Sequence, residues 1–155
     1  MTVPRIAAGL ATMALALSCH ASENIPLSAP DPSDNYVVTA ATPGQEASLR
    51  AQVQVMHPEV LPLRVIFVPH WKYLDNTRIW HLHLPTGYTS AMFTHLASRT
   101  VFIDQDRYMG GDWLGYWMAH ELGHLVTNSV REEDAEKAAA KFRKRLKGTA
   151  RQGDL

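Results

Sequence analysis

The sequence predicts a small α+β domain in which a short mixed sheet packs against two consecutive helices. Two β-branched apolar runs, at residues 63–68 and 100–104, are typical of buried strands. A helical pattern without proline then covers residues 113–126, and a second helix is expected after Ser129, which has the spacing of a capping box with Glu132. Strands followed by a pair of helices, with no internal repeat, indicate the α+β class.

The first 21 residues have the pattern of a secretory signal peptide. A single arginine supplies the positive start, the apolar run over residues 6–17 is too short to span a bilayer, and small residues follow. Cleavage is expected after Ser18 or Ala21. An imperfect lipobox ending before Cys19 is the alternative, and its lipidation would attach the protein to a membrane. The sequence therefore predicts an exported protein, either periplasmic or extracellular.

The cysteine count, the charge balance and the length of the chain limit the kinds of site and partner that can be expected. Cys19 is the only cysteine, so the exported domain has no internal disulfide, and any metal site must use His and carboxylate ligands. The 15 Lys and Arg residues balance the 15 Asp and Glu residues, which gives no reason to expect nucleic acid as a partner. A chain of 155 residues is long enough for one domain after processing, and its oligomeric state is left open.

The rest of the N-terminal half is expected to contain a flexible arm, a helix and a hairpin. Residues 22–45 are rich in Pro, Ser, Asp and Ala and are expected to form a flexible arm, so the folded domain is expected over residues 46–155. A helix over residues 47–56 is expected to open this domain. Residues 70–85 are aromatic and polar, with turn residues at Asp75-Asn76, and are compatible with a hairpin.

The most informative feature is a complete H-E-x-x-H motif, His120-Glu121-Leu122-Gly123-His124. On a helix the two histidines are one turn apart, so both imidazoles leave the same face and can bind one Zn²⁺. Glu121 then lies beside the metal, where a carboxylate can accept a proton from a water molecule that the metal acidifies. The motif predicts metal-assisted hydrolysis, with Glu121 as general base.

The helix that carries the motif has further features. Asp112 is the expected N-cap, and an apolar stripe is expected to face the core through Leu114, Met118, Leu122 and Leu125. Gly123 costs about 1 kcal/mol of helix stability relative to alanine. Its presence predicts the close approach of a strand or of the returning helix.

A catalytic zinc site needs a third protein ligand. No histidine follows His124, so a carboxylate of the returning helix is expected. Acidic side chains crowd the start of that helix: Glu132, Glu133, Asp134 and Glu136. Glu132 has helical spacing to Ala135, Ala139 and Phe142, which places it on the predicted buried stripe. Glu132 is therefore the first choice, and Glu136 and Glu133 are the alternatives.

These residues resemble the gluzincin metallopeptidases, whose zinc is held by the two motif histidines and a glutamate on a later helix. In several of these families the glutamate opens a Glu-x-x-Ala-Asp or Glu-x-x-x-Asp signature, which residues 132–136 match with Glu in place of the final Asp. The resemblance covers about residues 113–142. It implies a small zincin-like domain with one Zn²⁺ per chain bound by His120, His124 and Glu132, and it implies that Glu136 orients a motif histidine.

The chain departs from the larger gluzincins in two respects. Only a short turn separates His124 from Glu132, so the two helices must reverse tightly. Little chain follows to supply the His or Tyr that often stabilises the tetrahedral intermediate. Such a group is expected upstream instead, from among Tyr88, His95, Arg107 and Tyr108.

The function expected from these patterns is an exported zinc-dependent metallopeptidase that hydrolyses peptide bonds in a peptide or protein substrate by means of a zinc-activated water. The strand at residues 100–104 and the preceding residues 91–98 are expected to present an edge to an extended peptide. One alternative is a periplasmic or surface interaction module that binds zinc without processing anything. Another is a lipid-anchored interaction protein in which the histidine pair is incidental.

Overall fold

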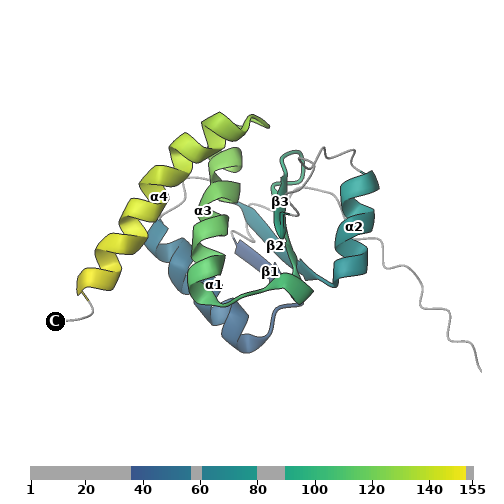
Figure 1. Ribbon diagram of the computed structural model, residues 1–155, viewed down its shortest axis with the longest axis horizontal. Helices are drawn as coiled ribbons and strands as arrows, with labels where there is room; N and C mark the ends of the chain where they lie inside the picture. Colours follow the sequence, from purple (N-terminus) through teal and green to yellow (C-terminus); the bar gives the residue numbers. More distant parts are fainter. Residues whose placement is uncertain (1–35, 57–60, 80–89, 153–155) are drawn as a thin grey trace, which may run out of the picture.

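The computed structural model describes residues 36–56, 61–79 and 90–152 and arranges them as one mixed sheet covered by helices (Figure 1). The strands are β1 (Tyr36–Thr39), β2 (Leu63–Val68), β3 (Met92–His95) and β4 (Thr100–Asp104). The helices are α1 (Pro43–Met56), α2 (His70–Ile79), α3 (Gly111–Thr127) and α4 (Glu132–Gln152), with a short 3-10 helix, η1 (Gln105–Arg107), after β4. The predicted α+β class with a short mixed sheet is confirmed.

The sheet has the strand order β1-β2-β4-β3. Strands β1, β2 and β4 are parallel, whereas β3 runs antiparallel to β4, with Thr94 opposite Val101, and forms an edge of the sheet in the part of the chain that the structure describes. The strands predicted at residues 63–68 and 100–104 are confirmed to the residue. Both are buried along almost their whole length, because helices cover both faces of the sheet, and this explains why their sequences are mostly apolar.

Helices α1, α3 and α4 lie on one face of the sheet, and α2 lies on the other (Figure 1). Successive residues of a strand point to opposite faces. In β2, Val65 and Phe67 therefore join the larger core under α1 and α3, while Ile66 and Val68 pack with Tyr73 of α2. The burial of these apolar side chains is the main favourable term in folding.

Helices α3 and α4 form an antiparallel pair that carries the candidate site (Figure 1). The stripe predicted on α3 is buried in the core through Leu114, Met118, Leu122 and Leu125. On α4 the predicted stripe is likewise buried through Ala135, Ala139 and Phe142. The small alanine side chains allow the two helix backbones to approach closely.

The hairpin predicted for residues 70–85 is wrong over its first part, which forms α2 instead. The helix begins directly after Pro69, whose carbonyl accepts a hydrogen bond from the Tyr73 N–H at 3.0 Å. The buried Tyr73 ring packs on Phe93 of the sheet. A single buried residue does not give the sequence a helical periodicity, so this helix could not be predicted from the sequence pattern. Its packing on the sheet determines it. Residues 80–89, which include Tyr88, lie outside the described residues.

The boundary predicted between arm and domain is also wrong where the structure describes it. Residues 36–39, expected within the arm, form β1 and pair in parallel with β2. Helix α1 begins at Pro43 rather than at residue 47. Thr42 and Gln45 form a reciprocal cap: the Gln45 N–H donates to Thr42 Oγ1 at 3.3 Å, and the Thr42 N–H donates to Gln45 Oε1 at 2.8 Å. Proline suits the position after such a cap, because its missing N–H is not needed there.

Two predicted caps differ from the structure. Helix α3 begins one residue before Asp112, and its N-cap is Gly110, whose φ of 103° is readily adopted only by glycine. The Ser129 hydroxyl accepts a hydrogen bond from the Arg131 N–H at 3.1 Å and donates to Asp134 at 2.8 Å, instead of forming the box with Glu132. Helix α4 begins only at Glu132, so the Ser129 hydroxyl serves the turn before the helix.

Among the described residues, every helix is too short or too polar to cross a membrane. The predicted signal peptide over residues 1–21 and the Cys19 site lie outside the described residues. Export and lipidation therefore stay predictions from the sequence.

Candidate metal centre

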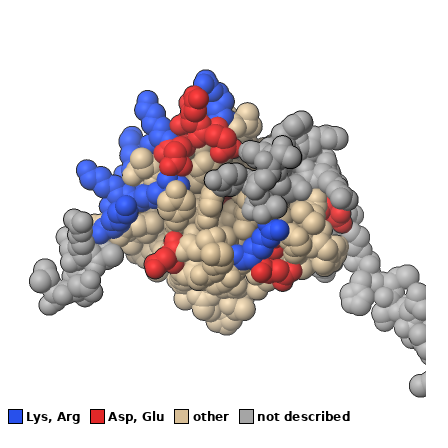
Figure 2. All heavy atoms as spheres, viewed as in Figure 1, with Lys and Arg blue, Asp and Glu red and all other residues tan. Residues whose placement is uncertain are grey.

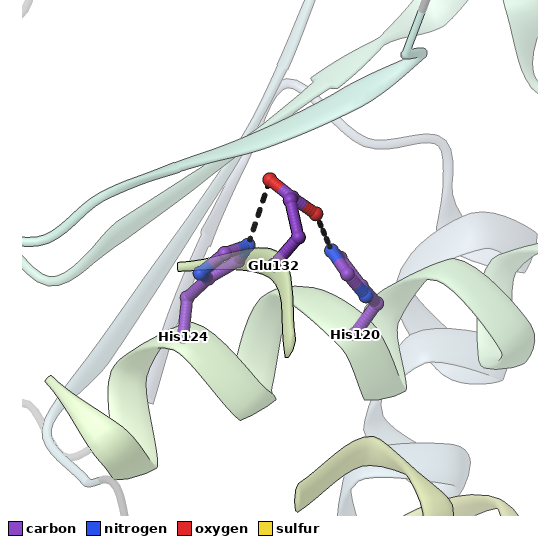
Figure 3. A group of neighbouring side chains, drawn as sticks. All are labelled: His120, His124 and Glu132. Atoms are coloured by element: carbon purple, nitrogen blue, oxygen red, sulfur yellow. Dashed lines mark hydrogen bonds and ion pairs between the residues drawn. The ribbon is translucent and has the colours of Figure 1, made fainter. Parts of the chain in front are cut away.

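The candidate site lies where the second half of α3 meets the start of α4 (Figure 3). His120 and His124 are one turn apart on α3, and their rings lie edge to face with centroids 4.9 Å apart. Glu132, the first residue of α4, extends its carboxylate between the two rings. The tight reversal after α3 brings these three side chains together.

The potential ligand atoms of His120, His124 and Glu132 all lie within 4.8 Å of one another. One carboxylate oxygen of Glu132 is 2.9 Å from His120 Nε2, and the other is 3.7 Å from His124 Nε2. Two imidazoles and a carboxylate are a donor set that suits Zn²⁺. The group can therefore hold a metal ion.

The Nδ1 nitrogen of each imidazole has a hydrogen-bond partner of its own. His124 Nδ1 lies 2.8 Å from the Ser129 carbonyl, which only accepts hydrogen bonds, so Nδ1 must carry the proton. His120 Nδ1 lies 3.1 Å from Glu136 Oε2. With Nδ1 of each ring engaged in this way, both Nε2 atoms face Glu132, which is the usual arrangement around metal-binding histidines. The residues present therefore fit zinc in orientation as well as in kind.

Glu136 is the carboxylate that the resemblance assigns to orienting a histidine, and the structure places it against His120. Arg143 donates a hydrogen bond to its other oxygen. This hydrogen bond is the main reason that the pKa of the Glu136 carboxyl lies below its ordinary value. Glu136 is therefore held as an ionised acceptor.

Glu121 lies between α3 and the edge strand. Its side chain is buried, and Thr94 of β3 donates a hydrogen bond to Glu121 Oε2 at 2.7 Å. Burial raises the pKa of the Glu121 carboxyl, and the Thr94 hydrogen bond and the nearby His124 and His120 oppose that rise. The sequence analysis missed Thr94, because no local spacing relates a strand residue to a helix residue 27 positions later.

Two backbone features at the end of α3 allow the tight turn into α4. Asn128 ends α3 in the left-handed conformation, with φ of 47°, and its N–H donates to the His124 carbonyl. A Cβ atom built on Gly123 would lie 2.9 Å from the carbonyl carbon of Ala135 and closer still to its oxygen. Gly123 therefore permits the close approach of the returning helix, as predicted.

Acidic side chains gather at the start of α4, and basic side chains follow along the rest of the helix (Figure 2). Glu132 alone among the four acidic candidates lies near both histidines in the described contacts. Glu133 pairs with Arg131 at 3.0 Å, and Asp134 accepts the hydrogen bond from Ser129. The expected burial of Glu132 is wrong: its side chain is 70% exposed, because the buried stripe runs out at the first residue of the helix.

The side chains predicted upstream to stabilise an oxyanion have their described contacts away from His120 and His124. His95 follows Thr94 on β3 and so points to the opposite face, where its Nδ1 lies 2.7 Å from Ser98 Oγ. Burial lowers the pKa of His95. Tyr108 packs edge-on against Phe67 and Trp113 at the start of α3, and Arg107 lies 3.6 Å from Asp104.

The arrangement predicts a difference between neighbouring glutamates. Glu132→Ala should weaken zinc binding by more than about 100-fold, because it removes the predicted third ligand rather than a supporting group. Glu133→Ala, whose carboxylate pairs with Arg131, should leave zinc affinity within about 2-fold of the parent. Titration against a chelating zinc indicator measures both. A Glu132→Ala variant that binds zinc as tightly as the parent and Glu133→Ala would exclude Glu132 as a ligand.

Comparison of the chain with known protein families, with curated proteins and with solved structures finds no match in any of the three.

Proposed function

We propose that this protein is a zinc-dependent peptidase that binds one Zn²⁺ through His120, His124 and Glu132. The observation that carries the proposal is the convergence of both Nε2 atoms on Glu132 while each Nδ1 is held by a separate acceptor. When bound, zinc supplies a Lewis acid that polarises a carbonyl group and acidifies water. An exported location, expected from residues 1–21, belongs to the same proposal.

Glu121 is the proposed general base. The Thr94 hydrogen bond engages Oε2 and orients the carboxylate, so Oε1 is the oxygen proposed to accept a proton from the attacking water. After the water oxygen has bonded to the carbonyl carbon, the C–N bond breaks, and the same carboxyl returns the proton to the leaving amine. Thr94 acts by positioning Glu121.

The edge strand supports a peptide as substrate. Strand β3 lies at the sheet edge in the described residues, and Thr94 connects it to Glu121. An extended peptide can add to such an edge by backbone hydrogen bonds, which an ester or a glycan cannot match. A peptide bound there would pass close to the proposed base.

A zinc-binding interaction module is the second candidate. Glu121 is only 3% exposed, and this burial favours the module because a general base must reach water. The two candidates agree on zinc binding and differ only in hydrolysis. A measurement of turnover therefore separates them.

Glu121→Gln tests the proposed function. The amide keeps the size of the side chain but cannot accept the proton, so the variant should retain one zinc per chain and lose peptide hydrolysis by at least about 100-fold. The measurement combines metal analysis with cleavage of a fluorogenic peptide library by the zinc-loaded protein. Glu133→Gln makes the same chemical change at an exposed site and should cleave at the parental rate.

Three results would count against the proposal in different ways. Cleavage by Glu121→Gln at the parental rate would remove Glu121 as the base. A zinc-loaded parent that cleaves no peptide would favour the module. A parent that binds no zinc would overturn both candidates.

A further inference from the structure

Four side chains join α3 to α4 beside the candidate metal centre. Tyr116 precedes His120 by one turn on α3, and Arg143 follows Glu136 by two turns on α4. Because the helices are antiparallel, Tyr116 and Arg143 meet at the same level, next to the contact between Glu136 and His120. We call these four residues, Tyr116, His120, Glu136 and Arg143, the clasp.

Arg143 is held from several sides. Its Nη1 donates to Glu136 Oε1, and its Nε donates to the Tyr116 carbonyl at 3.3 Å. Its guanidinium carbon lies 3.8 Å from the centroid of the Tyr116 ring, within the range of a cation–π contact. The Arg143 side chain is only 15% exposed, although it belongs to the strongly charged helix α4. These contacts hold the guanidinium group between Glu136 and Tyr116.

Glu136 would otherwise be free to change rotamer, because its side chain is 53% exposed. Exposed ion pairs usually contribute little, since ordering two long side chains costs entropy. Here one partner, Arg143, is already ordered by the Tyr116 carbonyl and ring. With Oε1 engaged by Arg143, Glu136 presents Oε2 to His120 Nδ1 at 3.1 Å.

The two histidines are fixed by different means. His124 Nδ1 is bound by the Ser129 backbone carbonyl, which the turn holds in place. His120 Nδ1 depends on the movable side chain of Glu136. A backbone acceptor needs no further support, whereas a side-chain acceptor orients a ring only as well as it is itself held.

We propose that Arg143 is a positioning residue for the metal centre: braced by Tyr116, it fixes Glu136 and thereby orients His120 for zinc. The inference rests on the proposed zinc site. Besides Glu132 and Glu136, it assigns a further residue of α4 to that site, about three helical turns after Glu132.

A double-mutant cycle on zinc affinity tests whether Arg143 acts through Glu136. Glu136→Gln and Arg143→Gln should each weaken zinc binding by about 10-fold, as expected for supporting residues of a metal ligand. The double variant should bind no more weakly than the weaker single variant, because both changes release the same contact. If Arg143 had a purely structural role, the fold losses of zinc affinity in the two single variants would instead multiply in the double variant.

Further variants separate the contacts of Arg143. Tyr116→Leu removes the ring and keeps the backbone carbonyl, so it should give a smaller loss than Arg143→Gln. Arg143→Lys keeps the charge and should recover part of the affinity. Arg131→Gln breaks the exposed pair with Glu133 and, as the matched control, should bind zinc like the parent.

A measurement on the metal-free protein tests the clasp independently of zinc. In the parent, the hydrogen bond to Glu136 should slow exchange of the proton on His120 Nδ1 and make it visible by nitrogen-edited NMR. Arg143→Gln should abolish this signal, and Arg131→Gln should preserve it. Circular dichroism of each variant confirms that the helices remain folded.

The outcomes distinguish the clasp from the zinc site itself. A parent that shows the Nδ1 proton but binds no zinc would overturn the metal centre, and with it any part of Arg143 in metal binding. A parent that binds zinc, with an Arg143→Gln variant that binds equally well and keeps the Nδ1 signal, would overturn only the proposal for Arg143. A double variant whose loss of zinc affinity is the product of the two single losses would also overturn the proposal for Arg143.

Discussion

Zinc binding is expected to be lost when His124 is replaced by alanine. The substitution removes one of three proposed ligands, and the remaining His120 and Glu132 form an incomplete site. We expect zinc affinity to fall by more than about 100-fold, beyond the effect of losing a supporting residue. Metal analysis after gel filtration and competition with a chelator measure the loss.

His95→Ala is the matched control, because this histidine lies on the opposite face of β3 and contacts Ser98. It should keep one zinc per chain. His124 also bonds to the turn through Nδ1, so His120→Ala serves as a second variant that leaves that contact intact. Parental zinc affinity in both motif variants would show that the histidine pair is not the metal site.

Gly123→Ala is expected to destabilise the protein, although alanine is the better helix former by about 1 kcal/mol. The new Cβ would lie 3.0 Å from the Cα of Ala135 and closer to its carbonyl group, which is backbone and cannot rotate away. Overpacking of this kind costs typically about 1–3 kcal/mol, and a backbone contact belongs at the upper end of that range. We therefore expect a net loss of about 1–2 kcal/mol in the free energy of unfolding.

The same substitution should weaken zinc binding, because relieving the contact moves the start of α4, which carries Glu132. Gly148→Ala on α4 is the control: a Cβ there meets nothing within 4 Å, so the variant should be as stable as the parent or more stable. Urea unfolding of both variants gives the comparison. A Gly123→Ala variant that gains stability like Gly148→Ala would mean that the helices separate at little cost.

These two predictions concern one structural requirement. His120 and His124 come from a single helix, and their relative position follows from helical geometry. Glu132 comes from another helix, so its position depends on how closely that helix returns. Gly123 and the Asn128 turn set this distance.

The sequence alone was sufficient where the relevant pattern is local. The strands at residues 63–68 and 100–104 were predicted to the residue, because a continuous β-branched run has few alternatives. The buried stripes of α3 and α4 followed from helical spacing. The sequence also nominated Glu132, which the structure places beside both histidines, although on an exposed side chain.

Tertiary structure alone decided the elements and contacts that depend on residues distant in the chain. Residues 36–39 become a strand by pairing with β2, and residues 70–79 become a helix by covering the second face of the sheet with Tyr73. The Thr94 contact with Glu121 and the Arg143 contact with Tyr116 join residues 27 positions apart. Sequence periodicity reports which side of an element is buried, but it carries no information about which residue of another element will lie against it.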